Sequence, residues 1–224
     1  MLRVKAIAPL LLTDDEMVRR QKRYDRLGGA TLAITLVNLV GDGAPERFDT
    51  PEQISVSEGL TALEIARTNP DDFDVIIPDC VLDPAVGEVA NAPVPVVGIL
   101  QLVSSYLASI GRPFAAVTRN RAIGDELARK VERYGLSRSL TGVHVLDVDF
   151  CLVSDHRGWA NAMSPLRNDL EAAGVRTLFN GCSAVDIDAD RLGSIAVVDP
   201  TLLALQLLSL ALCAGLFPTR RSAK

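Results

Sequence analysis

The feature that most constrains the fold of this chain is an apolar segment that ends in a cysteine and occurs twice. The first copy, 74–80, ends at Cys80, and the second, 177–182, ends at Cys182. Each copy is followed, at nearly the same distance, by a second apolar run and then by an apolar helical segment that ends near a glycine. We interpret the pattern as an internal duplication that puts two thiols at matching places in two half-domains.

Short apolar runs alternate with longer segments of helical periodicity along the whole chain. This alternation predicts an α/β fold, with parallel sheets that carry helices on both faces. Residues 1–100 together with 201–224 are expected to form an N-terminal lobe, and residues 101–200 a C-terminal lobe. Besides the segments that precede the two cysteines, strands are predicted at 3–8, 30–40, 95–99, 114–117, 143–148 and 194–198, and helices at 13–28, 51–68, 84–89, 100–110, 121–134, 156–173 and 201–217.

The composition supports this fold class and excludes several kinds of partner. Hydrophobic residues make up 48% of the chain and aromatic residues only 4%, which is typical of aliphatic parallel sheets covered by helices. The net charge is −5 with acids and bases interspersed, so neither a nucleic acid nor an anionic membrane is an expected partner. The apolar segment 201–217 is interrupted by Gln206 and Ser209 and is just too short for a membrane span. We expect a buried helix there that helps to form a homo-oligomer.

The four cysteines lack the close spacing of a zinc or redox site. A chain of 224 residues can bury a core without disulfides, so we expect reduced thiols and a cytoplasmic protein. No basic segment followed by an apolar one opens the sequence, and a secretory signal is therefore not expected. No glycine-rich phosphate loop is visible and the two histidines lack ligand spacing, so neither a cofactor nor a metal is predicted.

The predicted position of Cys80 and Cys182 suggests one kind of chemistry. The C-terminal ends of parallel strands share one edge of a sheet, where ligands bind in α/β proteins. A thiolate on one side of a small pocket can remove a proton from carbon, while a thiol on the other side delivers a proton to the opposite face. A cysteine pKa of about 8.5 is near operating pH, and a helix start after each cysteine is expected to lower it further.

Residues near the two cysteines are further candidates. Thr118 ends a predicted strand at the same edge, and Ser183 follows the second cysteine. Asp83, before Pro84, either shapes the pocket or caps a helix. Asp79 raises the thiol pKa of Cys80 if the two side chains point the same way, but neighbours in an extended chain usually point apart. The alternative for any lone cysteine after a strand is that it packs as a small hydrophobe. Cys151, Cys213 and His144 are expected to be structural, whereas His156 is a possible substrate contact.

A set of short segments carries a family pattern: Cys80-x-x-Asp83-Pro84, Pro95-Val96-Val97-Gly98, Val117-Thr118, and Gly181-Cys182 with Val197-Val198-Asp199. In these segments the chain resembles the aspartate/glutamate/hydantoin racemase superfamily, from about residue 73 to residue 215. The resemblance implies a cofactor-independent enzyme with two pseudo-symmetric α/β lobes and an active site in the cleft between them. It also implies that Cys80 and Cys182 are the acid/base pair.

Within that superfamily the chain is most similar to the hydantoin and allantoin racemase branch. The residues after the cysteines, Val81-Leu82 and Ser183-Ala184, differ from the Asn-Thr and Thr-His or Thr-Glu of amino-acid racemases. The chain also departs from the hydantoin branch, with Ala85-Val86 for Gly-Leu and Ala8-Pro9-Leu10 for Asn-Pro-Asn. Together with the resemblance, the positions favour six residues as substrate contacts: Pro9, Val81, Asp83, Thr118, Gly181 and Ser183.

Three functions follow from this reading. The first is a racemase or epimerase for a small substrate with an acidic carbon next to a carbonyl, most plausibly in a hydantoin-like ring. The second is another reaction of the superfamily, either maleate cis-trans isomerisation with a covalent cysteine or decarboxylation of an arylmalonate with one thiol as proton donor. The third is a non-catalytic two-lobed α/β binding protein in which the thiols are packing residues.

Overall fold

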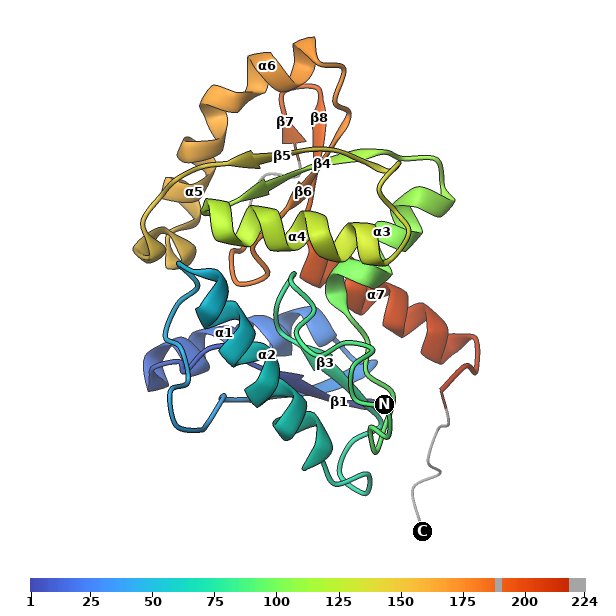
Figure 1. Ribbon diagram of the computed structural model, residues 1–224. Helices are drawn as coiled ribbons and strands as arrows, with labels where there is room; N and C mark the ends of the chain where they lie inside the picture. Colours follow the sequence, from blue (N-terminus) through green and yellow to red (C-terminus); the bar gives the residue numbers. More distant parts are fainter. Residues whose placement is uncertain (188–190, 218–224) are drawn as a thin grey trace.

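The computed structural model describes residues 1–187 and 191–217 and contains two sheets in two lobes (Figure 1). The first sheet has three parallel strands in the order β2-β1-β3, and the second has five strands in the order β5-β4-β6-β8-β7. The predicted fold class, α/β with helix-flanked parallel sheets in two lobes, is confirmed. The predicted division at residues 100 and 200 stays a prediction, and residues 188–190 and the tail 218–224 lie outside the described residues.

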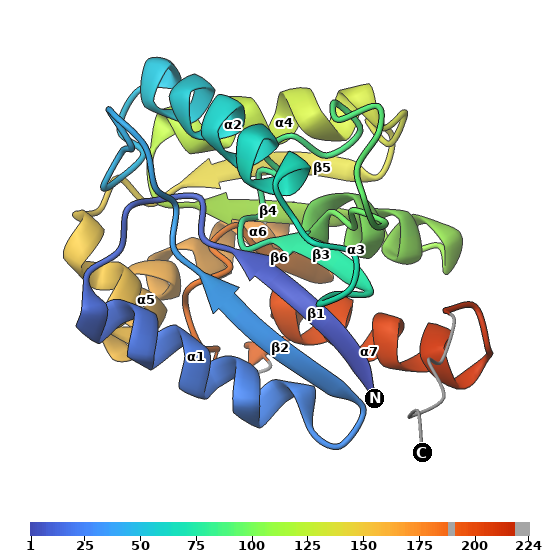
Figure 2. The ribbon, with the colours of Figure 1, turned by 90° about the horizontal axis from the view of Figure 1, so that it is seen from below.

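The first sheet consists of β1 (Leu2–Ile7), β2 (Leu32–Val37) and β3 (Val75–Pro78). It lies between α1 (Asp14–Gly28) and α2 (Pro51–Ala66), as Figure 2 shows. The alternation of side chains along the strands explains this arrangement. One face joins Tyr24 of α1 in the main core, and the other face packs Ile7 and Ile76 against Ile65 of α2.

The second sheet is formed by β4 (Phe114–Thr118), β5 (Leu140–Val145), β6 (Thr177–Asn180), β7 (Arg191–Leu192) and β8 (Ile195–Val198). Strands β4, β5, β6 and β8 are parallel, whereas the edge strand β7 runs antiparallel to β8. The sequence predicted parallel strands only. Strand β7 was not predicted, because a strand of two residues carries no periodicity. The helices of this part are α3 (Ile99–Ser109), α4 (Arg121–Arg133), α5 (His156–Met163), α6 (Arg167–Ala172), α7 (Pro200–Cys213) and the short 3-10 turns η1 (Phe150–Ser154) and η2 (Ser164–Leu166).

Several predicted elements differ from the structure. The single helix predicted at 156–173 is interrupted by η2, because Pro165 lacks the N–H that a continuous helix needs. The helix predicted at 84–89 is a series of turns, in which Asp83 and Ala85 adopt left-handed φ angles of 48° and 61°. The run 95–99 contributes only an isolated parallel bridge between Val96 and Ile76. The strand predicted at 143–148 begins and ends earlier, at 140–145.

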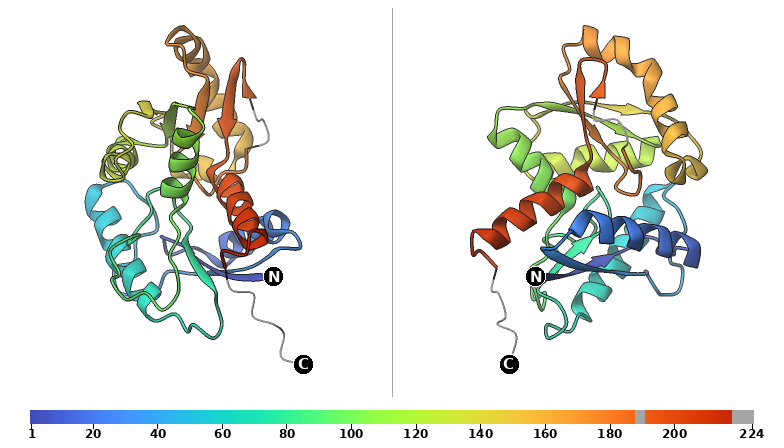
Figure 3. Two further views of the ribbon diagram at one scale, coloured as in Figure 1. Left: turned by 90° about the vertical axis from the view of Figure 1, so that its right-hand side faces the viewer. Right: turned by 180° about the vertical axis from the view of Figure 1, so that it is seen from behind.

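Helix α7 returns from the second sheet to the lobe of the first (Figure 3). It buries Ala204, Leu205 and Leu208, and Ser209 lies within 2.9 Å of the Thr31 hydroxyl. One hydrophobic core therefore continues from Leu2 in the first sheet to residues of α7, so the two lobes are joined by packed side chains. No helix in residues 1–187 and 191–217 has the length and apolar character that crossing a membrane requires.

Candidate active site

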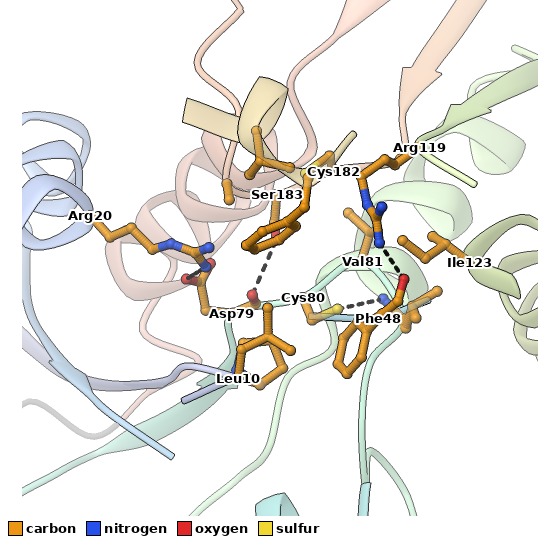
Figure 4. A pocket seen from close by; sticks show the side chains of 16 residues that line it. Leu10, Arg20, Phe48, Asp79, Cys80, Val81, Arg119, Ile123, Cys182 and Ser183 are labelled. Atoms are coloured by element: carbon orange, nitrogen blue, oxygen red, sulfur yellow. Dashed lines mark hydrogen bonds and ion pairs between the residues drawn. The ribbon is translucent and has the colours of Figure 1, made fainter. Parts of the chain in front are cut away.

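A small cavity lies where the carboxyl ends of β1, β3, β4 and β6 converge (Figure 4). Its volume is about 50 Å³, which admits on the order of four water-sized groups. Each lobe contributes half of the lining, which is mostly apolar. The lining residues are Pro9, Leu10, Arg20, Phe48, Asp79, Cys80, Val81, Leu82, Arg119, Ile123, Phe150, Val153, Gly181, Cys182, Ser183 and Ala184.

Cys80 stands two residues beyond the end of β3, in the turn that leaves the sheet. Its side chain is only 7% exposed, and its sulfur accepts a hydrogen bond from the backbone N–H of Leu82 at 3.4 Å. No helix begins after Cys80, contrary to the prediction, because Asp83 and Ala85 turn the chain through left-handed conformations. A backbone donor is nevertheless present at the sulfur, supplied by the turn.

Cys182 occupies the corresponding position two residues beyond β6. The preceding residue, Gly181, donates its backbone N–H to Val117 at 2.7 Å, an approach that requires glycine because a Cβ there lies 2.4 Å from the same oxygen. Asn180 donates to the carbonyl of Cys182 at 2.9 Å and accepts from the Trp159 indole at 3.1 Å. The backbone of the cysteine is thus fixed on both sides, although the predicted helix start after it is again a turn.

Helix α1 of the first lobe holds the turn that follows Cys182. Arg23 donates to the carbonyls of Ser183 and Val185 and to the carboxylate of Asp199, the last at 2.7 Å. Arg19, one turn earlier, donates to the carbonyl of Ala184 at 3.0 Å. Through these contacts α1 brings positive charge close to the second thiol.

Asp79 lies beside Cys80 and is buried. Its carboxylate accepts hydrogen bonds from Tyr24 at 2.7 Å and from Arg20 at 3.1 Å, and its backbone carbonyl accepts from Ser183 at 3.1 Å. Tyr24 and Arg20 both belong to α1, so this carboxylate ties β3 to the helix that also carries the turn after the second cysteine. The sequence left open where the Asp79 side chain points, and the structure turns it toward α1.

The two thiols have different electrostatic surroundings. Burial raises the pKa of Cys80 strongly; the Leu82 N–H opposes this effect, and the negative charges of Asp79 and Cys182 add to it. Burial also raises the pKa of Cys182, but the Ala184 N–H and then three guanidinium groups, of Arg20, Arg23 and Arg119, lower it. The expectation of thiol pKa values near neutrality is therefore not met, because both sulfurs lie in a low-dielectric cavity without a helix terminus. Cys182 is the thiol that ionises more readily.

The structure brings most of the predicted site residues to the cavity and leaves three outside its lining: Thr118, Asp83 and His156. Pro9, Val81, Gly181 and Ser183 line it together with the two cysteines. Thr118 is buried outside the cavity lining, and its hydroxyl donates to the carbonyl of Asn120 at 3.2 Å.

Asp83 lies deeper still and serves a structural role. Its carboxylate accepts from the backbone N–H groups of Leu100 and Gln101, at 2.9 and 2.7 Å, and from the Tyr134 hydroxyl at 2.9 Å. It therefore caps α3, whose own N-cap residue, Gly98, has no side chain. Burial raises the pKa of Asp83 to about 6, although these donors and Lys130 act in the opposite direction.

Comparison with known proteins identifies the family of the chain. The Asp/Glu/hydantoin racemase family profile matches residues 16–208, which is most of the chain. The chain belongs to this racemase family. No curated protein sequence matches it significantly.

Several solved structures share the fold at low sequence identity. Allantoin racemase from Klebsiella pneumoniae superposes with a TM-score of 0.79 at 16% identity, over 100% of this chain and 96% of that one. Allantoin racemase from Pseudomonas fluorescens gives 0.77 at 14% identity, over 99% and 95%. The maleate isomerase from Pseudomonas putida S16 gives 0.59 at 14% identity, over 95% and 93%. At these identities the likeness establishes the fold and leaves the substrate open.

The arginines of this family member are the site residues that sequence reasoning missed. Arg20 and Arg119 both line the cavity, yet Arg20 follows Glu16 by four residues and looks like half of a surface ion pair. A signal existed in α1, where Arg20 and Arg23 occupy the helical face that also carries Tyr24. Charged residues on a face shared with a core aromatic indicate a buried polar site.

Among the described residues, no group of three His, Cys, Asp or Glu side chains is placed to hold a metal ion.

Proposed function

We propose that the protein is a cofactor-independent racemase or epimerase that uses Cys80 and Cys182 as an acid/base pair. The observation that carries the proposal is that both thiols, remote in sequence, line one small cavity between the two lobes. Each follows a parallel strand at the same distance and has a backbone donor two residues later. The substrate class that we propose is a small molecule with an acidic carbon next to a carbonyl, and a hydantoin-like ring is the first candidate in that class.

In the proposed reaction a thiolate takes the proton from the acidic carbon, and the C–H electron pair passes into the carbonyl to give an enolate. The opposite thiol then donates its proton to the other face of that carbon, so the configuration inverts. One sulfur gains the proton that the other loses. Cys80 serves as the base for one enantiomer and Cys182 for the other, and the reverse reaction or proton exchange with solvent restores the starting state.

Two backbone N–H groups are suited to hold the carbonyl oxygens of such a substrate. Val81 and Ser183 follow the cysteines directly, and both line the cavity. Within the described part of the chain, neither backbone N–H donates a hydrogen bond. A donor fixed near the developing enolate oxygen stabilises it without reorganisation, which is the usual function of an oxyanion hole.

Solvent deuterium exchange tests the proposal. In heavy water, a panel of hydantoins with one substituent at the stereocentre should exchange the ring proton and racemise, as followed by proton NMR and polarimetry. Cys80→Ser and Cys182→Ser should each reduce racemisation by about 10²- to 10⁴-fold. Cys151→Ser and Cys213→Ser are the matched controls, because these thiols are exposed and lie outside the cavity. Racemisation that survives in both cavity variants would end the proposal.

A carboxylate isomerase or decarboxylase of the same family is the second candidate, since two arginines line the cavity and guanidinium groups suit carboxylates. A covalent substrate adduct on Cys80, detected by mass spectrometry, would identify the isomerase. Dependence on Cys182 alone would identify the decarboxylase. Absence of proton exchange and of turnover with every carbon acid tested would instead favour a binding protein without catalysis.

The setting of the protein is part of the proposal. All four cysteines are free thiols, which fits a reducing, cytoplasmic environment. Leu210 and Leu216, in and after α7, expose most of their side chains, which fits a homo-oligomer.

A further inference from the structure

Three charged side chains line the cavity, and two of them neutralise each other. Arg20 donates from Nη1 to Asp79 at 3.1 Å and from Nε to Glu16 at 2.7 Å. These two carboxylates, one in the lining and one behind it, balance that guanidinium. Arg119 is the third charged residue, and its only carboxylate partner among the described residues, Asp49, lies outside the lining with its side chain 38% exposed.

The guanidinium of Arg119 has donors that make no hydrogen bond within the described residues. The residue is 5% exposed, and Nη2 donates to the carbonyl of Phe48 and, at 2.6 Å, to Asp49. Nε and Nη1 donate to no residue in the described ranges. Both nitrogens lack a hydrogen-bond partner in that part of the chain without being fully enclosed, so each is accessible to a small ligand. A buried guanidinium stays charged and cannot lower its cost by releasing a proton, so unused donors there favour an anionic oxygen.

The surroundings indicate from which side the anion comes. A second hollow on the outer side of Arg119 is lined by three carboxylates, of Asp49, Asp147 and Asp149, and by one further cation, Arg47, which pairs with Asp49. The two remaining carboxylates disfavour an anion there. On the inner side the guanidinium lies beside Val81 and Ile123, in an apolar space where charge interactions are strong (Figure 4). The inner side is also the side of the second thiol, because Arg119 and Cys182 line the same cavity.

From this geometry we infer that Arg119 is a specificity-determining residue that binds a carboxylate of the substrate. The inference rests on the proposed acid/base pair and keeps the acidic carbon next to a carbonyl, but it replaces the hydantoin-like ring by small carbon acids that carry a carboxylate besides the activated carbon. The carboxylate accepts hydrogen bonds from Nε or Nη1 of Arg119 and orients the acidic carbon between the two sulfurs. A neutral ring leaves these donors without a partner and is therefore disfavoured.

A binding experiment that needs no turnover tests this inference. Malonate and its neutral counterpart malonamide have the same size and an acidic carbon between two carbonyl groups, and hydantoin serves as the neutral ring. Calorimetric titration of the full chain should show malonate binding at least about tenfold more tightly than either neutral probe, the ratio that one charge-assisted hydrogen bond supplies. Equal or tighter binding of malonamide or hydantoin would overturn the inference without any variant.

Substitutions locate the effect. Arg119→Gln should abolish the preference for malonate, and Arg119→Lys should restore part of it. Asp49→Asn is the matched control, because it removes the negative charge that pairs with Arg119 but leaves the guanidinium in place. Arg121→Gln removes a neighbouring exposed arginine, and both controls should keep the preference. A preference that persists in Arg119→Gln, or disappears in Asp49→Asn alone, contradicts the assignment.

The outcome is separable from that of the deuterium-exchange experiment. If exchange depends on both cysteines but malonate shows no advantage, only the role of Arg119 fails. If malonate binds through Arg119 but exchange persists in both cysteine variants, the racemase proposal fails instead. With a turned-over carboxylate substrate, Arg119→Gln should raise KM more than it lowers kcat, because the carboxylate is bound equally in the ground and transition states.

Discussion

Gly181 is the position where a single methyl group tests how the second thiol is placed. Its backbone donates to the carbonyl of Val117 at 2.7 Å, which pairs the end of β6 with β4 immediately before Cys182. A Cβ added there lies 2.4 Å from the Val117 oxygen and 2.7 Å from Cγ2 of Thr118. We therefore expect Gly181→Ala to displace the turn that carries the cysteine.

The magnitude follows from the atoms involved. Ordinary contacts of a Cβ begin near 3.4 Å, so the carbonyl of Val117 and Gly181 must separate by about 1 Å. The obstructing atom belongs to the backbone of a buried strand, which cannot rotate aside as a flexible side chain does. Overpacking of this kind costs about 1–3 kcal/mol of stability. A displacement of about 1 Å at a reacting group can reduce the rate about 10²-fold.

Two measurements and one control separate these effects. Urea unfolding should give a lower midpoint for Gly181→Ala, and isotope exchange on an identified substrate should slow about a hundredfold in conditions where the variant is folded. Gly59→Ala is the control, because a Cβ at Gly59, in α2, meets nothing within 4 Å, and alanine favours a helix. It should be neutral or slightly stabilising. Wild-type stability and exchange in Gly181→Ala would refute the placement of Cys182 described above.

Three further predictions concern titration. Iodoacetamide should modify Cys182 before Cys80, as peptide mass spectrometry reports, because guanidinium groups lower the pKa of the former against burial; the reverse order contradicts this assignment. The rate of isotope exchange should still rise above pH 9, since burial raises the pKa of Cys182 above that ordinary value. Asp83 has a folded pKa of about 6, raised from 3.8, so its contribution to stability is fully present below pH 3.8 and is lost as the pH rises to about 6. The loss is about 3 kcal/mol, and Asp83→Asn should remove this pH-dependent part of the urea unfolding free energy.

The sequence predicted the alternation of strands and helices because the local signals were strong. The Thr13 hydroxyl accepts from the backbone N–H of Glu16 and caps α1, and Gly111, Gly135 and Gly174 follow helices with positive φ angles. The turns after β3 could not be predicted in this way. Ala85 adopts a left-handed conformation that alanine rarely takes, and Asp83 in the same turn is held by the backbone N–H of Leu100, a partner that no local pattern indicates.

The site was predicted in part, for a related reason. A cysteine two residues after a parallel strand has a position that the strand itself determines, so Cys80 and Cys182 could each be assigned to the carboxyl edge of a sheet from their sequence context. Arg20 and Arg119 could not. Their burial depends on partners that lie far away in the chain, Asp79 for the first and the carbonyl of Phe48 for the second. Without coordinates a charged residue in a polar segment reads as solvent-exposed.

The two cysteines have equivalent backbone positions but unlike charged neighbours, and these two features have different consequences for the proposed chemistry. Two equivalent backbone positions give the two sulfurs comparable geometry, which a reaction that runs equally from either enantiomer requires. The proton, however, must reside on only one sulfur when a substrate binds, and identical surroundings would not decide which one. Asp79 precedes Cys80 and raises its pKa, whereas the arginines near Cys182 lower its pKa. In the proposed reaction the unlike side chains therefore favour the singly ionised state in which Cys182 is the thiolate and Cys80 the acid, and the enantiomer that needs Cys80 as its base reacts from the less populated state, in which the proton lies on Cys182.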